Sequence, residues 1–248
     1  MAAPGVALVT GASRGLGAEI AVALAGAGHP VALGYRTGHE AAETVVARIV
    51  GAGGRAVALA ADVTDPDGVR DLVAGTQAAL GPVEILVVNA TGPQPPSPAE
   101  TLTWAQVEPM LDYFVRSPVL LMEAVVPGMV ARGSGRIVHV GSEVAASVPP
   151  GTAAYVAAKS AQLGLARASA RDLGRHGITV NTVAPGWVPV ERHVDSDPAD
   201  VAAYVADVPL GRHGTPAEVA AAVVHLASPA AAFVNGAVLH VNGGRTLG

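Results

Sequence analysis

Short apolar runs alternate along the chain with longer, alanine-rich stretches in which apolar positions recur at helical spacing. This alternation is typical of βαβ units, whose parallel strands are joined by helices. Strands are predicted at Val6–Thr10, Pro30–Tyr35, Arg55–Ala60, Ile85–Val88, Arg136–Val140, Ile178–Val183 and Ala237–Val241. Helices are predicted near Gly15–Ala27, His39–Val50, Asp65–Leu80, Ser97–Arg132 in two pieces, Thr152–Arg175 and Pro216–Leu226. The pattern therefore predicts an α/β fold, doubly wound and three-layered, with a seven-stranded parallel sheet.

Both halves of the chain contribute strands to this predicted sheet, so residues 1–248 are interpreted as a single domain. The proline-rich run from Pro93 to Pro98 is either a spacer between domains or a rigid loop after the fourth strand. We favour the loop, because a βα connection is expected there. Residues Val188 to Pro209 show no clear strand or long helix. Long insertions of this kind are often lids or binding loops, so a substrate loop is predicted near residues 188–209.

Composition narrows the classes of function. Half of the residues are hydrophobic and only 14% are charged, which excludes a disordered chain. The net charge of −5 includes no block of like charges, so neither a nucleic acid nor a membrane is an expected partner. The absence of cysteine excludes disulfides and zinc–cysteine sites, and is compatible with a cytoplasmic location. No histidine pair has helical ligand spacing, and no metal is predicted.

A glycine-rich turn, Thr10–Gly17, directly follows the first predicted strand and opens the first predicted helix. Glycines in this place let the backbone approach a pyrophosphate, while the free N–H groups of the helix favour the anion. A tight βα turn also needs glycine for purely structural reasons. The order of strand, turn, helix and strand favours a Rossmann-like dinucleotide site. The residues predicted to contact the cofactor here are Gly11, Ser13, Arg14, Gly15, Leu16 and Gly17.

The end of the second predicted strand favours NADP(H) over NAD(H). An acidic residue is expected there if the adenosine ribose 2′-OH is bound, but the chain reads Gly34-Tyr35-Arg36. Arg36 and Arg14 can instead bind a 2′-phosphate through charge-assisted hydrogen bonds. The alternative is two solvated surface arginines.

The chain has one lysine among its fifteen basic residues, Lys159, and it follows Tyr155 by four positions. Residues four apart share a helix face, so the phenol and the ammonium can face one site. A nearby ammonium lowers the pKa of a tyrosine toward working pH, as an acid–base catalyst requires. The alternative interpretation is that Tyr155 is only an aromatic residue on the surface of the helix. Ser142, after the fifth strand, either binds a substrate carbonyl or is a local turn residue.

Taken in order, these motifs resemble the short-chain dehydrogenase/reductase family, in particular the branch that includes 3-oxoacyl-[acyl-carrier-protein] reductases. The resemblance spans nearly the whole chain. It also covers Asp62-Val63, Asn89-Ala90, Asn181–Gly186, Pro209–Arg212 and Val241–Gly244. It implies that Tyr155 donates a proton to the carbonyl oxygen, that Ser142 orients the carbonyl, and that Lys159 holds the nicotinamide ribose. Together with Tyr35 and Arg36 at the end of the second strand, the further cofactor contacts that it implies are Asp62, Val63, Asn89, Ala90, Tyr155, Lys159, Pro185, Gly186 and Val188.

The chain departs from the family pattern in three places, which together involve four residues. After the fourth strand the family reads Asn-Asn-Ala-Gly, and this chain has Val88 in place of one asparagine and Thr91 in place of the glycine. Val190 stands where the family has a threonine that contacts the nicotinamide amide. Phe114 stands where a catalytic asparagine usually supports a water that leads from the lysine to solvent. Pro118, four residues later, has no N–H to give the Phe114 carbonyl. Either this free carbonyl binds the relay water, or Phe114 simply packs in the core beside a proline kink.

The sequence thus predicts NADPH-dependent reduction of a ketone, in the form of a 3-oxoacyl thioester or a polyketide-like carbonyl, to a secondary alcohol. Two alternatives remain open: an NADP(H)-binding sensor or scaffold with weak catalysis, and an enoyl reductase. Partners are expected to be a small-molecule ketone, free or carrier-bound, and further copies of the chain in a homodimer or homotetramer.

Overall fold

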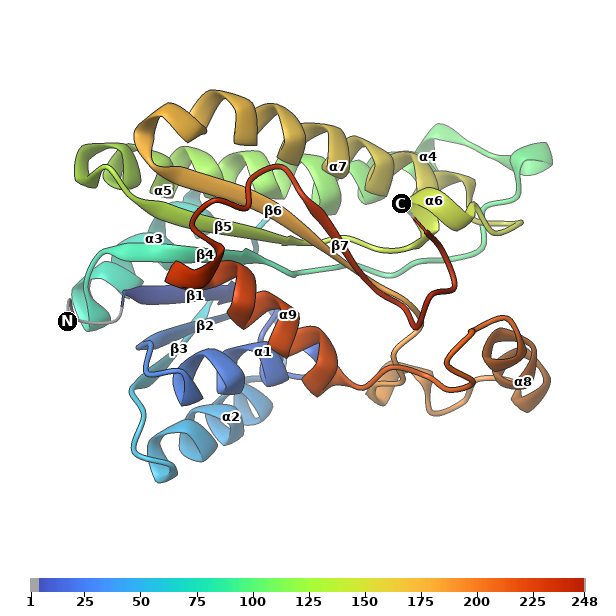
Figure 1. The fold of residues 1–248 in the computed structure, drawn as a ribbon, viewed down its shortest axis with the longest axis horizontal. Coiled ribbons are helices and arrows are strands. Elements are labelled where there is room, and N and C mark those ends of the chain that lie inside the picture. The colour runs from blue at the N-terminus through green and yellow to red at the C-terminus, as the bar shows by residue number, and fades with distance from the viewer. Residues whose placement is uncertain (1–4, 248) are drawn as a thin grey trace.

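The computed structural model describes residues 5–247 and contains one sheet with helices on both faces (Figure 1). The strands are β1 Val6–Thr10, β2 Val31–Tyr35, β3 Ala56–Ala60, β4 Val83–Val88, β5 Gly135–Val140, β6 Ile178–Pro185 and β7 Val238–Val241. They lie in the order β3-β2-β1-β4-β5-β6-β7, and every neighbouring pair is parallel. The predicted α/β class with a seven-stranded parallel sheet is confirmed.

Helices cover both faces of the sheet (Figure 1). One layer holds α1 Gly15–Gly26, α2 His39–Gly51 and α9 Pro216–Ala227, and the other holds α3 Pro66–Leu80, α5 Ser117–Arg132 and α7 Ala153–Leu173. Each layer buries its own apolar cluster against the strands, and the buried side chains are mainly Val, Leu, Ile and Ala. Because the strand order reverses between β1 and β4, a crevice opens at the carboxyl ends of these two strands.

The predicted two-piece helix Ser97–Arg132 is one continuous helical run from Trp104 to Arg132. It comprises α4 Trp104–Leu111, a π-helical turn η2 Asp112–Arg116, and α5. The Ser117 N–H donates to the Asp112 carbonyl five residues earlier, which is the π-type pattern. The run is long and apolar enough to cross a membrane by length and composition alone. Its buried side chains, however, pack beneath the sheet with α3 and α7.

The segment Val188–Pro209 contains more helix than its sequence indicated. The 3₁₀ turn η4 Glu191–His193 is followed by α8 Pro198–Ala206, a helix of nine residues. The segment expected to lack a clear strand or long helix thus holds one short helix that the sequence pattern did not indicate. The Asp197 side chain accepts a hydrogen bond from the Ala199 N–H, and Pro198 suits the first helical position. None of the α8 residues is buried, which explains why no apolar periodicity in the sequence indicated this helix.

The remaining short elements are η1 Ala99–Thr101, α6 Val144–Ser147, η3 Gly174–His176 and η5 Pro229–Ala231. The Pro93–Pro98 run forms the connection from β4 toward α4. Ser97 ties it to the start of α7, because its N–H donates to the Gly151 carbonyl at 2.7 Å and its Oγ accepts from the Ala154 N–H at 3.1 Å. The carboxyl ends of the strands, α6, α8 and the start of α7 therefore surround one end of the sheet (Figure 1).

Candidate active site

A cavity of about 410 Å³ lies at the carboxyl ends of β1 to β4, at the strand-order reversal. Its lining includes the predicted cofactor residues Gly11, Ser13, Arg14, Gly15, Leu16, Gly17, Tyr35, Arg36, Asp62, Val63, Asn89 and Ala90. Pro185, Gly186, Val188, Ser142, Tyr155 and Lys159 lie outside this lining. The Val188 side chain is buried in the core, so only its backbone groups are left to contact a ligand.

The glycine turn is held in shape by the end of β4. The Asn89 side-chain amide donates to the carbonyls of Thr10 at 2.8 Å and Gly11 at 3.1 Å. A Cβ on Gly17 would lie 2.3 Å from the Gly11 carbonyl oxygen, so this position admits only glycine without rearrangement. The backbone of the turn can therefore approach a ligand closely at the start of α1, where free N–H groups favour an anion.

Arg36 and Arg14 both line the cavity and bring positive charge to it. The Arg36 guanidinium lies 3.5 Å from the Asp62 carboxylate and 5.8 Å from the centre of the Tyr113 ring. Burial raises the pKa of Asp62, but hydrogen bonds from Thr64 and the charge of Arg36 outweigh it and leave the pKa below its usual value. Burial raises the pKa of Tyr113, so its phenol stays protonated at neutral pH.

Glu191, in the predicted substrate loop, lies at the cavity beside the glycine turn. Its carboxylate accepts a hydrogen bond from the Gly15 N–H at 3.4 Å. A phosphate bound to the same N–H would be repelled by this carboxylate, because both are negatively charged. The Glu191 side chain would therefore have to move away when the anion binds. The segment Val188–Pro209 thus contributes residues to this cavity.

Tyr155 and Lys159 lie on α7 with the Phe114 ring beside them. The Phe114 and Tyr155 rings meet edge-on with centres 5.5 Å apart. The Lys159 ammonium lies 4.0 Å from the centre of the Phe114 ring and 5.9 Å from that of Tyr155. Phe114 is 1% exposed and packs with Met110, so the interpretation of Phe114 as a core residue fits the structure. The role of its carbonyl in a water relay stays a prediction.

The end of β5 brings Ser142 to the same region. The Lys159 ammonium donates to the carbonyl of Val140, two residues before Ser142, at 2.8 Å. The Ser142 Oγ accepts a hydrogen bond from the Val144 N–H at 3.3 Å, which is also the geometry of a local turn residue. The structure therefore brings the carboxyl end of β5 and the Tyr155–Lys159 pair together.

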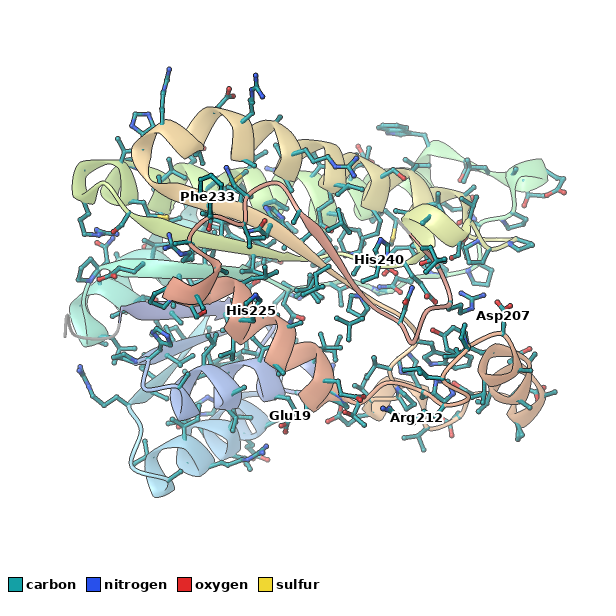
Figure 2. All side chains as sticks on the ribbon, viewed as in Figure 1. Glu19, Asp207, Arg212, His225, Phe233 and His240 are labelled. Atoms are coloured by element: carbon teal, nitrogen blue, oxygen red, sulfur yellow. The ribbon has the colours of Figure 1, made fainter. Side chains whose placement is uncertain are left out.

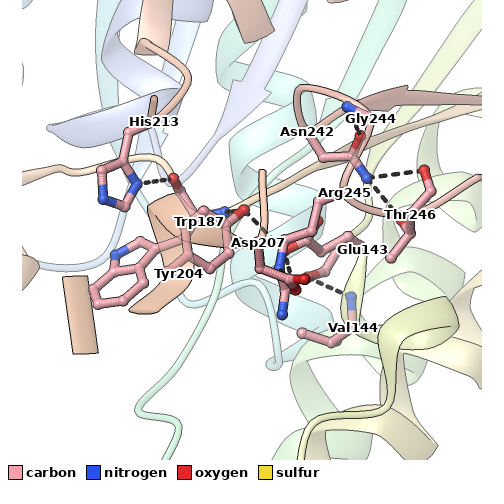
Figure 3. A network of polar contacts seen from close by, with 11 residues as sticks. Glu143, Val144, Trp187, Tyr204, Asp207, His213, Asn242, Gly244, Arg245 and Thr246 are labelled. Carbon is pink, nitrogen blue, oxygen red and sulfur yellow. Dashed lines mark hydrogen bonds and ion pairs between the residues drawn. The ribbon is translucent and has the colours of Figure 1, made fainter. Parts of the chain in front are cut away.

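Beside Ser142, the buried Glu143 joins three distant segments (Figure 3). Its Oε1 accepts hydrogen bonds from the Tyr204 hydroxyl of α8 at 2.9 Å and from Arg245 of the C-terminal segment at 2.8 Å. Arg245 also pairs at 2.9 Å with Asp207, at the end of α8 (Figure 2). Burial raises the pKa of Tyr204 to about 12, and the Glu143 carboxylate adds to this, so the phenol remains a donor. The network fastens α8 over the site.

Aromatic rings complete this attachment. The Tyr204 ring stacks on His213 with centres 5.1 Å apart and meets Trp187 edge-on at 5.4 Å. The Trp187 N–H donates to the Tyr204 hydroxyl, and a Cβ on Gly186 would lie 2.3 Å from that oxygen. Gly186 is thus glycine because the tyrosine approaches its backbone. Trp187 therefore packs against α8.

Sequence reasoning missed several lining residues: Gly34, Thr37, Ala61, Gly92 and Pro93. All lie at or just beyond the ends of β2, β3 and β4. The signal that could have found them is position alone, because strand ends at a strand-order reversal line the crevice.

Comparisons with known proteins agree with this geometry. A family model described as "Enoyl-(Acyl carrier protein) reductase" matches residues 11–246. The 3-oxoacyl-[acyl-carrier-protein] reductase of Vibrio cholerae is 38% identical over 241 residues, which cover 96% of each chain. A crystal structure of a 3-oxoacyl (acyl-carrier-protein) reductase from Agrobacterium tumefaciens with NADP bound is 37% identical, with a TM-score of 0.90 over 98% of this chain and 95% of that one.

A short-chain dehydrogenase/reductase mutant from Serratia marcescens is 36% identical, with a TM-score of 0.90 and 98% of each chain covered. The chain belongs to the short-chain dehydrogenase/reductase family, as its motifs indicated. It is an oxidoreductase of that family.

Proposed function

We propose that the protein reduces a ketone to a secondary alcohol with NADPH, and that Tyr155 is the proton donor. The observation that carries this proposal is the Tyr155–Lys159 pair at the end of β5, next to a cavity rimmed by Arg14 and Arg36. The relatives named as 3-oxoacyl-[acyl-carrier-protein] reductases, and the neighbour with NADP bound, support it.

The residues of the cavity fit a dinucleotide phosphate. Gly11 and Gly17 let the turn pack tightly against itself and the end of β4, and the start of α1 offers N–H groups to the pyrophosphate. Arg36 and Arg14 would hold the 2′-phosphate, while Asp62 and Val63 would face the adenine. When bound, the nicotinamide supplies a hydride for the carbonyl carbon.

The chain's own residues then handle orientation and the proton. Ser142 Oγ hydrogen-bonds the carbonyl oxygen and fixes its direction. Tyr155 donates its phenolic proton to that oxygen as negative charge develops there, and the Lys159 ammonium stabilises the tyrosinate that is left.

The proposed substrate class is a 3-oxoacyl thioester or a similar ketone, free or held on a carrier. An enoyl reductase is the second candidate, because the matching family model carries that description. Product analysis separates them: a ketone reductase yields a secondary alcohol, and an enoyl reductase yields a saturated acyl chain. We propose a cytoplasmic homodimer or homotetramer, in which the outer faces of α5 and α7 would meet a second copy.

Arg36→Ala is expected to lower kcat/KM for NADPH by about 10- to 100-fold and to leave that for NADH nearly unchanged, since a charge-assisted phosphate contact contributes ~1.5–3 kcal/mol. Steady-state kinetics with both cofactors measure this. The matched control is Arg55→Ala, an exposed arginine at the opposite, amino end of β3. Equal losses with NADPH and NADH would contradict the assignment of Arg36 to the 2′-phosphate.

A further inference from the structure

The Lys159 ammonium has an unusual set of neighbours for a group that is only 6% exposed. It donates to the Val140 carbonyl at 2.8 Å and to the Gln162 side-chain Oε1 at 3.0 Å. The face of the Phe114 ring lies 4.0 Å away. Burial penalises a charged amine unless such groups compensate it. These three neighbours therefore keep the lysine both charged and fixed.

Gln162 has no evident structural reason to be polar. It is 2% exposed, it lies on the inner face of α7, and its neighbours on that face are apolar alanines such as Ala158 and Ala166. A buried carboxamide costs free energy unless it is hydrogen-bonded, and its carbonyl oxygen is bonded to Lys159. The position of Gln162, three residues after the lysine, puts both side chains on one helix face.

Phe114 contributes from a different element. The π-helical turn η2 brings its ring against both Tyr155 and Lys159. A cation over an aromatic face is stabilised by the ring quadrupole, and the effect grows when water is excluded. Phe114 is 1% exposed, so this contact is dry.

The other ionisable groups near Lys159 do not compete with its charge. His139 on β5 is fully buried, and burial together with the positive charge of Lys159 lowers its pKa to about 4, so the ring is neutral. On η2, Asp112 and Arg116 pair with each other at 3.7 Å and are partly exposed. On α7, the Tyr155 ring lies 5.9 Å from the ammonium.

We propose that Gln162 and Phe114 are positioning residues for catalysis. They hold the Lys159 ammonium in a water-excluded position, from which its charge stabilises the ionised form of Tyr155. This inference rests on the proposed function of Tyr155 as the proton carrier. The carboxamide supplies a neutral hydrogen-bond acceptor and the ring supplies a negative face. Both groups are neutral, so they hold the ammonium without cancelling the charge that acts on the tyrosine.

The test is the pH dependence of alcohol oxidation by NADP⁺, because the oxidation requires the tyrosinate form of Tyr155. Gln162→Met keeps the length of the side chain and removes the oxygen. It is expected to lower kcat near pH 7 by about tenfold, as for a lost hydrogen bond to a charged group, and to move the midpoint of the pH–kcat curve upward by about one pH unit. Activity is recovered at high pH, where Tyr155 ionises without help.

Phe114→Leu is the second variant, with a smaller shift of the midpoint in the same direction. Gln77→Met, at an exposed position of α3, is the matched control and leaves the midpoint unchanged. Melting temperatures of all variants are measured alongside. A Gln162→Met enzyme with an unchanged midpoint overturns the inference, whether its kcat is normal or is reduced at every pH by poor folding.

Tyr155→Phe in the same assay separates this inference from the proposed function. If Tyr155→Phe keeps its turnover, the proposed function fails and the inference fails with it. If Tyr155→Phe is inactive and Gln162→Met behaves as the wild type, only the inference about Gln162 is wrong.

Discussion

Tyr155→Phe is expected to lower kcat for ketone reduction by about 10²–10⁴-fold, the usual contribution of a positioned general acid. Phenylalanine keeps the ring that packs edge-on against Phe114 but removes the only hydroxyl that Tyr155 can offer the carbonyl oxygen. Stopped-flow or steady-state measurement of NADPH oxidation with a 3-oxoacyl thioester gives the rate.

The dissociation constant of NADPH and the melting temperature serve as internal controls for this variant. Both are expected to change little, because Tyr155 is not among the residues that line the cavity proposed for the cofactor. A Tyr155→Phe variant that retained a tenth or more of the wild-type turnover would contradict the mechanism. A variant that lost NADPH binding as well would assign Tyr155 to binding instead.

Glu143→Ala is expected to destabilise the protein by about 2–3 kcal/mol. Removing one partner of a fully buried ion pair costs ~3–5 kcal/mol, because the other charge stays buried without compensation. The cost is expected to be lower here because Arg245 has a side chain that is 18% exposed and keeps its contact with Asp207. Urea unfolding measures the change in the free energy of unfolding.

Asp207→Ala is the matched control, since both carboxylates bind the same arginine. The Glu143 side chain is 4% exposed and that of Asp207 is 67% exposed, so only the first pair is protected from solvent screening. Loss of the exposed partner is expected to cost ~0–1 kcal/mol. Equal destabilisation by the two variants would show that the burial of Glu143 does not govern how firmly α8 is attached.

The strands and the glycine turn were predictable because their signals are local. A fully apolar run such as Ile85–Val88 cannot be placed at a surface, and Gly11 and Gly17 meet close contacts that no other residue tolerates. The pairing of Tyr155 with Lys159 was visible because helical spacing is fixed by backbone geometry.

The rest depends on contacts between residues far apart in the chain. α8 has no buried residue and is held by Tyr204 through Glu143, 61 positions away, so no periodicity indicated it. Gln162 is a polar residue on an Ala-rich helix, and only the folded structure brings its oxygen to the ammonium of Lys159. The π-helical turn that presents Phe114 likewise follows from packing between α4, α5 and α7.

The most direct test of the central claim is the fate of the hydride. NADPH that carries deuterium at the transferable C4 position is incubated with the protein and a 3-oxoacyl thioester, and the product is analysed by mass spectrometry and NMR. The account predicts a secondary alcohol with one deuterium on the carbinol carbon, formed by the wild type and not by Tyr155→Phe. Tight NADPH binding with no labelled alcohol from any ketone, or label appearing only in a saturated chain made from an enoyl thioester, would contradict it.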